Sequence, residues 1–121
     1  MRRCLIVDDS RLIRRVERRM METLGFEVSE AEDGHQALAR CAAGMPDVVL
    51  LDWVMPHMDG LEFLMALRKL AGGTGPRVIF CTSQVDMSFV SRAIEAGADE
   101  FVMKPFDIDT LGAKLAEVGL V

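Results

Sequence analysis

The sequence predicts a single α/β domain in which five parallel strands alternate with five helices around one doubly wound sheet. Strand-like and helix-like patterns alternate strictly along the 121 residues, and the loops between them are short. This alternation favours parallel strands joined by right-handed crossovers, with helices on both faces of the sheet. Continuous apolar runs such as 48–51 are typical of strands buried on both faces. For five strands we expect the order 2-1-3-4-5, with the switch point between the first and third strands.

Composition narrows the class of protein. The formal net charge of −5 argues against a general nucleic-acid binder, which would carry a basic surface. No apolar run approaches the roughly 18 residues of a membrane span, so we expect no membrane segment. The three cysteines are widely spaced and form no C-x-x-C pair, so we expect buried free thiols in a reducing cytoplasm.

The first strand–helix unit begins with an apolar run. Residues 3–7 predict a strand, and a helical pattern follows from Ser10 until Gly25 ends it. The predicted inward face of this helix consists of Leu12, Ile13, Val16, Met20 and Leu24. Its other face is dense in arginine, with Glu17 and Glu22 expected beside the arginines on that exposed face.

The second unit begins with alternating apolar and polar residues at 26–30, which is typical of an edge strand. Asp33, with Gln36 three residues later, predicts the start of a second helix that ends near Gly44. The residues expected to face inward from this helix are Ala37, Leu38, Cys41 and Ala42.

The second half of the chain contains three more units. A buried strand is predicted at 48–52, and Asp59 with Glu62 has the capping-box spacing that begins a helix ending near Leu70. The remaining strands are expected at 77–81 and 99–103, and the remaining helices at 86–96 and, after Asp107, at 108–118.

Polar residues end four of the five predicted strands. The first strand ends at Asp8 and Asp9, the third at Asp52, the fourth at Thr82 and the fifth at Lys104. In an open α/β sheet, ligands bind in the crevice at the carboxyl ends of the strands. Three carboxylates placed together repel one another, which would raise the pKa of one of them or recruit a compensating cation. Oxygen ligands favour Mg²⁺ over zinc as that cation.

A hydroxyl and an ammonium beside these carboxylates match the needs of a phosphoryl group. Lys104 would neutralise its oxygens, Thr82 would donate a hydrogen bond, and Asp52 would be the nucleophile. Each residue alone has an ordinary explanation as a cap, a turn hydroxyl or a solvated charge. Their joint position at four strand ends favours a functional site. His35 and His57 lie at no predicted strand end and are expected at the surface.

Four motifs carry a family resemblance: LIVDDS, VVLLDWVMPHMDG, VIFCTS and FVMKPF. In order and spacing they resemble the motifs of response-regulator receiver domains of bacterial two-component signalling, over essentially the whole chain. The resemblance implies a CheY-like, flavodoxin-like fold with Asp52 as phosphoacceptor. It also implies an Mg²⁺ site formed by Asp8, Asp9, Asp52 and the backbone carbonyl of Val54. Thr82 and Lys104 would hold the phosphoryl group, and the Lys104–Pro105 peptide bond would be cis.

The resemblance also implies a switch and two positions that tune its lifetime. Phosphorylation would draw Thr82 towards the phosphoryl group and let Phe101 turn inward, which would reshape the face formed by the fourth helix, fifth strand and fifth helix. Val54 and Gln84 occupy the lifetime-tuning positions. Because Val54 cannot orient a water molecule, we expect slower self-dephosphorylation than in a Val54→Asn variant.

The arginines of the first helix have two interpretations. They form an ordinary solvated face, or they dock a sensor histidine kinase or a histidine phosphotransferase. The residues considered for docking are Arg11, Arg14, Arg15 and Arg18.

Taken together, these patterns predict a stand-alone receiver domain over residues 1–121, without an output domain and without enzymatic turnover. We expect a monomer that signals through another protein, either a flagellar-motor component in chemotaxis or a member of a phosphorelay. A receiver-like binding protein that is never phosphorylated is a further alternative. A haloacid-dehalogenase-type phosphatase is disfavoured because Val54 stands where it needs a second Asp. An FMN protein is disfavoured because DDS replaces its phosphate loop.

Overall fold

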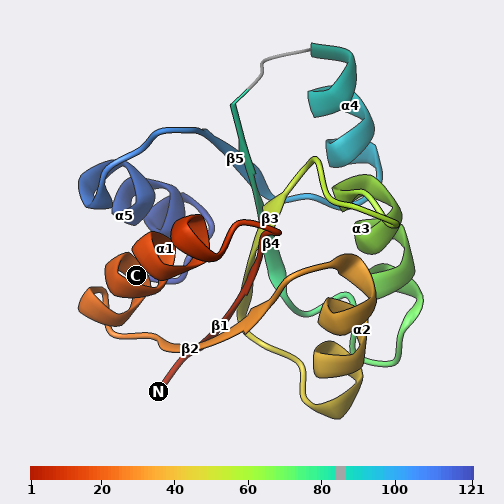
Figure 1. Cartoon of the computed structure of the whole chain (residues 1–121), viewed down its shortest axis with the longest axis horizontal. Coiled ribbons are helices and arrows are strands. Elements are labelled where there is room, and N and C mark those ends of the chain that lie inside the picture. Colours follow the sequence, from red (N-terminus) through yellow and green to blue (C-terminus); the bar gives the residue numbers. More distant parts are fainter. Residues whose placement is uncertain (84–86) are drawn as a thin grey trace.

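A computed structural model describes residues 1–83 and 87–121 and contains one five-stranded parallel sheet (Figure 1). The strands are β1 (Arg3–Val7), β2 (Glu27–Ala31), β3 (Val48–Asp52), β4 (Arg77–Thr82) and β5 (Glu100–Met103). The helices are α1 (Arg11–Thr23), α2 (Gly34–Ala43), α3 (Gly60–Lys69), α4 (Met87–Glu95) and α5 (Ile108–Glu117). The strand order is β2-β1-β3-β4-β5, and all four pairings are parallel, so the predicted topology is confirmed.

Helices cover both faces of the sheet. Helices α1 and α5 lie on one face, and α2, α3 and α4 lie on the other (Figure 1). Alternate residues of the central strands face opposite sides: Leu5 and Val49 pack towards α2 and α3, whereas Ile6 and Leu50 pack towards α1 and α5. This arrangement explains why the central strands read as continuous apolar runs.

Side-chain caps start α1, α2, α3 and α5. Ser10, Asp33, Asp59 and Asp107 each accept a hydrogen bond from the backbone N–H three residues ahead. The Glu62 side chain in turn accepts a hydrogen bond from the backbone N–H of Asp59, which completes the expected capping box. These local bonds place each helix start close to the predicted position.

The predicted inward face of α1 is wrong in part: Met20 and Leu24 do pack against the core, but two other members of this face do not. Leu12 and Val16 are 68% and 43% exposed, whereas Glu17 and Met21 are the residues of α1 that are buried. The contacts of Arg14 account for the difference, because its side chain reaches Glu30 on β2 and the main-chain carbonyl of Asp8. Holding Arg14 against the sheet rotates the row containing Glu17 inward and Leu12 outward.

Smaller differences concern element limits and single side chains. Strand β2 begins at Glu27, one residue later than predicted, and Phe26 is buried in the core beside α1. Ala42 of α2 is exposed, because the inward row of this short helix ends at Cys41. All three cysteines are free and buried, as predicted. Among the described residues, no helix is both long and apolar enough to cross a membrane.

Candidate functional site

The five residues predicted from the strand ends line one cavity. Asp8 and Asp9 follow β1, Asp52 and Thr82 end β3 and β4, and Lys104 follows β5. All five border a cavity of about 380 Å³ at the carboxyl edge of the sheet. Parallel pairing produces this convergence, because it brings the carboxyl ends of all strands to the same edge.

Lys104 joins two of the carboxylates. Its Nζ atom donates a hydrogen bond of 2.8 Å to Oδ2 of Asp8 and one of 3.2 Å to Oδ1 of Asp52. The main chain of Lys104 is fixed as well, since its N–H donates to the carbonyl of Thr82 at 2.7 Å. The Lys104–Pro105 peptide bond is cis. The ammonium is therefore held over the carboxylates by contacts at both ends of the residue.

The electrostatics of the site follow from burial and mutual charge. Burial and the neighbouring charge of Asp8 raise the pKa of Asp52, while Lys104 acts in the opposite direction. Burial alone would lower the pKa of Lys104, but the hydrogen bond to Asp8 and the charges of both carboxylates raise it. Lys104 is therefore a permanent cation at the site.

The three carboxylates can hold a metal ion. One oxygen from each of Asp8, Asp9 and Asp52 lies within 4.8 Å of the others. The side chain of Asp8 is oriented by the backbone N–H of Ser10, which donates to its Oδ1 at 2.8 Å. This cluster offers only oxygen ligands and no thiolate or imidazole, which suits a hard cation.

Of the two predicted lifetime-tuning positions, Val54 lies within the part of the chain that the structure describes. Val54 lines the same cavity, and its side chain is 71% exposed. An apolar group therefore stands at the mouth of the cavity, directly beyond the acceptor strand. Gln84, the other lifetime-tuning position, lies outside the described residues.

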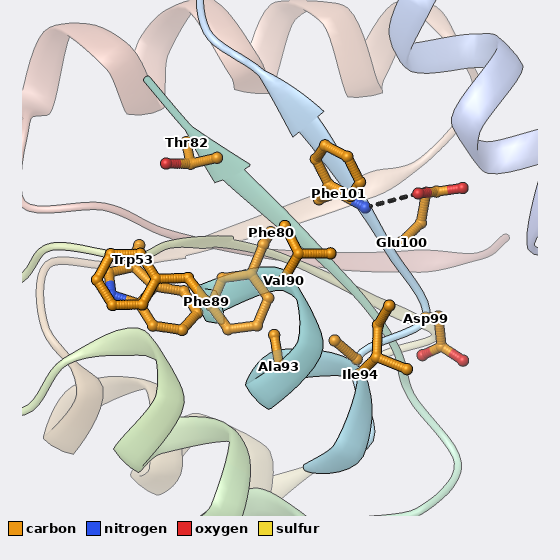
Figure 2. Close-up of a pocket in the computed structure, with 11 residues that line it drawn as sticks. Trp53, Phe80, Thr82, Phe89, Val90, Ala93, Ile94, Asp99, Glu100 and Phe101 are labelled. Carbon is orange, nitrogen blue, oxygen red and sulfur yellow. Dashed lines mark hydrogen bonds between the residues drawn. The ribbon is translucent and has the colours of Figure 1, made fainter. Parts of the chain in front are cut away.

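A second, smaller cavity of about 60 Å³ lies between α4 and β5 (Figure 2). Thr82 and Phe101, the predicted switch pair, both line it. The ring of Phe101 also lies 5.5 Å from Nζ of Lys114 on α5. Phe101 therefore lines the cavity that it shares with Thr82 and also lies close to α5.

An aromatic cluster connects the two cavities. The ring of Trp53 lies 4.9 Å from that of Phe80 and 4.7 Å from that of Phe89, between ring centroids. Trp53 and Phe89 line the cavity beside Phe101 (Figure 2). Both residues also line the acceptor cavity. The residue next to Asp52 is thus packed directly against the first turns of α4.

The arginines of α1 divide into two groups. Arg14 and Arg18 form ion pairs of 3.0 and 2.6 Å with Glu30, and these contacts lower the pKa of Glu30 although burial opposes them. Arg11 and Arg15 are exposed. Of the four arginines considered for docking, these two are the most accessible.

Sequence reasoning missed two residues near the site. Glu17 was expected on the exposed face of α1 but is buried beside Lys104. Phe89 lies in the helix predicted at 86–96, to which no role at the site was assigned, although it lines the acceptor cavity. Helical periodicity does place Glu17 one turn after Ile13, which faces the same cavity. No comparable sequence signal marks Phe89.

Comparison with known sequences places these features in a family. The model of the response regulator receiver domain matches residues 4–116. The chemotaxis protein CheY of Bacillus subtilis is 39% identical over 108 residues, which cover 88% of each chain. The response regulator MprA of Mycolicibacterium vanbaalenii is 37% identical over 113 residues, 93% of this chain and 48% of MprA. The chain therefore spans about half the length of that second relative.

Solved structures give the same result. The chemotaxis protein CheY4 of Vibrio cholerae superposes with a TM-score of 0.93 at 32% identity, covering 98% of both chains. A CheY-like receiver domain protein of Methanospirillum hungatei superposes with a TM-score of 0.89 at 30% identity, covering 98% of this chain and 93% of that one. With its sheet order, strand-end residues and family match in agreement, the chain belongs to the response regulator receiver domain family.

Proposed function

We propose that this receiver domain is a phosphorylation switch in which Asp52 accepts a phosphoryl group from a histidine kinase or histidine phosphotransferase. The observation that carries the proposal is the position of Asp52, which shares one cavity with Asp8, Asp9, Thr82 and Lys104. Its Oδ1 lies 3.2 Å from the Lys104 ammonium. A carboxylate nucleophile beside a fixed cation is suited to phosphoryl transfer.

In the proposed step, a carboxylate oxygen of Asp52 attacks the phosphorus atom of a phosphohistidine. A P–O bond forms while the P–N bond breaks, and its electron pair stays on the imidazole nitrogen. The Lys104 ammonium stabilises the negative charge that develops on the phosphoryl oxygens, and the Thr82 hydroxyl donates a hydrogen bond to one of them. These residues thus stabilise the transferred group and require no further reactant.

We propose Mg²⁺ as the ion of the acidic cluster. Asp8, Asp9, Asp52 and the backbone carbonyl of Val54 would hold it, which fits the oxygen-only donor set. When bound, the ion would supply positive charge to the phosphoryl oxygens.

In the proposed switch, a movement of Thr82 changes the position of Phe101. A phosphoryl group on Asp52 would recruit the Thr82 hydroxyl and change the space into which Phe101 can turn, since both residues line the 60 Å³ cavity. The surface of α4, β5 and α5 would then bind an output protein. The identity to CheY of Bacillus subtilis favours chemotaxis-type signalling with a flagellar-motor partner. The three buried free thiols support a location in the reducing cytoplasm.

A phosphorelay shuttle is the second candidate, because the same acceptor chemistry can return phosphate to a histidine phosphotransferase. Exposed Arg11 and Arg15, on the helix beside the site, suit repeated docking of such a partner. A receiver-like protein that is never phosphorylated remains a third candidate, which the complete set of acceptor-site residues disfavours.

Intact mass and Trp53 fluorescence test the proposal during titration with Mg²⁺ and acetyl phosphate. We expect one phosphoryl adduct that depends on Mg²⁺ and is absent from the Asp52→Asn variant. Because Trp53 follows Asp52 directly, its emission should change with metal and again with phosphoryl transfer. An unmodified wild-type mass, together with emission that Mg²⁺ does not alter, would contradict the proposal and favour a phosphorylation-independent binding role.

A further inference from the structure

Glu17 is a buried acid that the proposed phosphoryl transfer does not use. Among the described residues, Asp8 and Glu17 are the charged residues that are buried, at 2% and 3% exposure. Asp8 belongs to the acceptor site. Glu17 comes from the middle of α1 and is one of the two residues of this helix that are buried. A carboxyl group in this position costs free energy unless it is neutral or paired.

A cavity joins Glu17 to the acceptor site. Glu17 lines a mainly apolar cavity of about 300 Å³ together with Lys104 and Phe106. Three residues of this cavity, Ile13, Ser83 and Lys104, also line the acceptor cavity. Lys104 therefore borders both cavities: it shares the acceptor cavity with Asp8 and Asp52 and the second cavity with Glu17.

The Glu17 carboxyl group has no fixed partner. Within residues 1–83 and 87–121 it makes no hydrogen bond or ion pair, and no fully buried side-chain oxygen lacks a partner. Its oxygens must therefore reach the cavity that it shares with Lys104. The Lys104 ammonium has three N–H donors, and the bonds to Asp8 and Asp52 occupy two of them.

The surroundings of Glu17 favour its neutral form at pH 7. Burial raises its pKa from 4.5 to about 8; Lys104 opposes this rise, and Asp8 and Asp52 add to it. The strands beneath it also present the thiols of Cys4 and Cys81, whose pKa values are raised by burial, so both stay neutral. Lys104 is thus the cation that faces Glu17 from the packed strands.

We propose that Glu17 is a positioning residue for Lys104, with which it shares the 300 Å³ cavity next to the acceptor site. A neutral Glu17 leaves the ammonium with the strand carboxylates. An ionised Glu17 is a third anion that competes for the remaining N–H donor and draws Lys104 away from Asp52. The inference rests on the proposed phosphoacceptor role of Asp52, because the position of Lys104 affects phosphoryl transfer to Asp52.

The first test measures Glu17 directly in the unphosphorylated protein. We follow the side-chain carboxyl carbon of Glu17 by NMR from pH 5 to pH 10 in the wild type, in Lys104→Met and in the control Lys69→Met, on exposed α3 surface. Loss of the facing cation should raise the titration midpoint in Lys104→Met and leave it unchanged in Lys69→Met. Equal midpoints in the wild type and Lys104→Met would overturn the inference.

The second test compares the rates of phosphorylation by acetyl phosphate in the wild type, Glu17→Gln and the control Glu22→Gln between pH 7 and pH 9. If neutral Glu17 supports transfer, the ratio of the Glu17→Gln rate to the wild-type rate should rise about tenfold over this range. The ratio for Glu22→Gln should stay constant. Parallel profiles for Glu17→Gln and the wild type would overturn the inference.

A wild type without any adduct would instead contradict the proposed function, and the NMR result would still decide whether Glu17 faces Lys104.

Discussion

The main-chain carbonyl of Asp52 leaves no room for a side chain at Gly60. A Cβ atom added to Gly60 would lie 2.7 Å from the oxygen of Asp52 and 2.7 Å from Cε1 of Phe80. The N–H of Gly60 also donates to the carbonyl of Trp53 at 2.9 Å. The first residue of α3 is therefore packed directly against the backbone that presents the acceptor carboxylate.

Gly60→Ala should consequently disturb both stability and phosphorylation. The added methyl group must displace backbone or the Phe80 ring, so we expect a loss of about 1–3 kcal/mol in the free energy of unfolding. Urea unfolding and acetyl phosphate labelling measure the two effects. Gly112→Ala is the matched control, because its Cβ would meet Leu24 Cδ2 at 3.7 Å, an ordinary contact, and alanine favours a helix interior. A Gly60→Ala protein as stable and reactive as the wild type would show that this packing does not constrain Asp52.

Arg68 connects the loops at the opposite edge of the sheet. Its guanidinium donates to the carbonyls of Gly73, Pro76 and Gly97 at 2.9, 2.8 and 2.6 Å, and it pairs with Asp99 at 3.3 Å. One side chain thus satisfies three loop carbonyls that no regular element pairs. Charge-assisted bonds of this kind contribute more than neutral ones.

Arg68→Met should keep the aliphatic packing and lose all of these bonds. We expect a decrease of about 2–4 kcal/mol in the free energy of unfolding, because several carbonyls lose their partner together. Lys69→Met is the control, since the neighbouring Lys69 is exposed. Equal denaturation midpoints for the two variants would mean that water replaces the guanidinium at little cost.

The raised pKa of Glu17 predicts a particular dependence of stability on pH. The folded chain holds a proton on Glu17 up to about pH 8, whereas an ordinary glutamate releases it near 4.5. Between these values the folded state binds more protons than the unfolded state, so stability falls as pH rises through this window and levels off above it. Glu17→Gln lacks this loss. Its stability relative to the wild type should therefore increase from pH 5 to pH 8, by an upper limit of about 4 kcal/mol.

Urea titrations of both proteins at several pH values measure this difference. Glu22→Gln is the control, because Glu22 is half exposed and pairs with Arg18 on the helix surface. A constant difference between Glu17→Gln and the wild type from pH 5 to pH 8 would be inconsistent with a neutral, buried Glu17.

The features that sequence predicted well are those fixed by neighbours along the chain. The capping bond of Asp59 and the apolar run of β3 need no knowledge of distant residues. The strand-end cluster was also predictable, because parallel pairing forces Asp8 and Asp52 to the same edge. Lys104 joins them through the pairing of β4 with β5.

The features that sequence missed depend on contacts between elements. Two rows of α1 compete for the core, one with Leu12 and Val16 and one with Glu17 and Met21, and hydrophobicity alone favours the first. The bonds of Arg14 to Glu30 and to the Asp8 carbonyl favour the second. Such bonds join residues from three segments, so no local pattern reveals which row the helix buries.

The exposed arginines of α1 predict an electrostatic docking surface for a phosphohistidine-bearing partner. Arg11→Glu combined with Arg15→Glu should slow phosphotransfer from the partner protein and leave labelling by acetyl phosphate unchanged, because neither side chain touches the acceptor cavity. Stopped-flow Trp53 fluorescence at two salt concentrations measures both rates. Arg40→Glu, on exposed α2 surface, is the control for reversing one arginine charge elsewhere on the molecule. Partner phosphotransfer that is as fast as in Arg40→Glu would leave Arg11 and Arg15 as solvated surface.

Val54 predicts a long-lived phosphoryl group. Its side chain is 71% exposed at the rim of the acceptor cavity, where an amide could orient a water molecule towards Asp52 and a valine cannot. Val54→Asn should therefore lose phosphate several-fold faster than the wild type, because its amide can position the attacking water molecule. The decay of the phosphorylated mass after removal of acetyl phosphate measures both lifetimes. Val54→Ala separates the two causes, since it opens the rim without adding a polar group. If Val54→Ala decays as fast as Val54→Asn, valine protects the phosphoryl group by covering it; if both decay no faster than the wild type, Val54 does not control its lifetime.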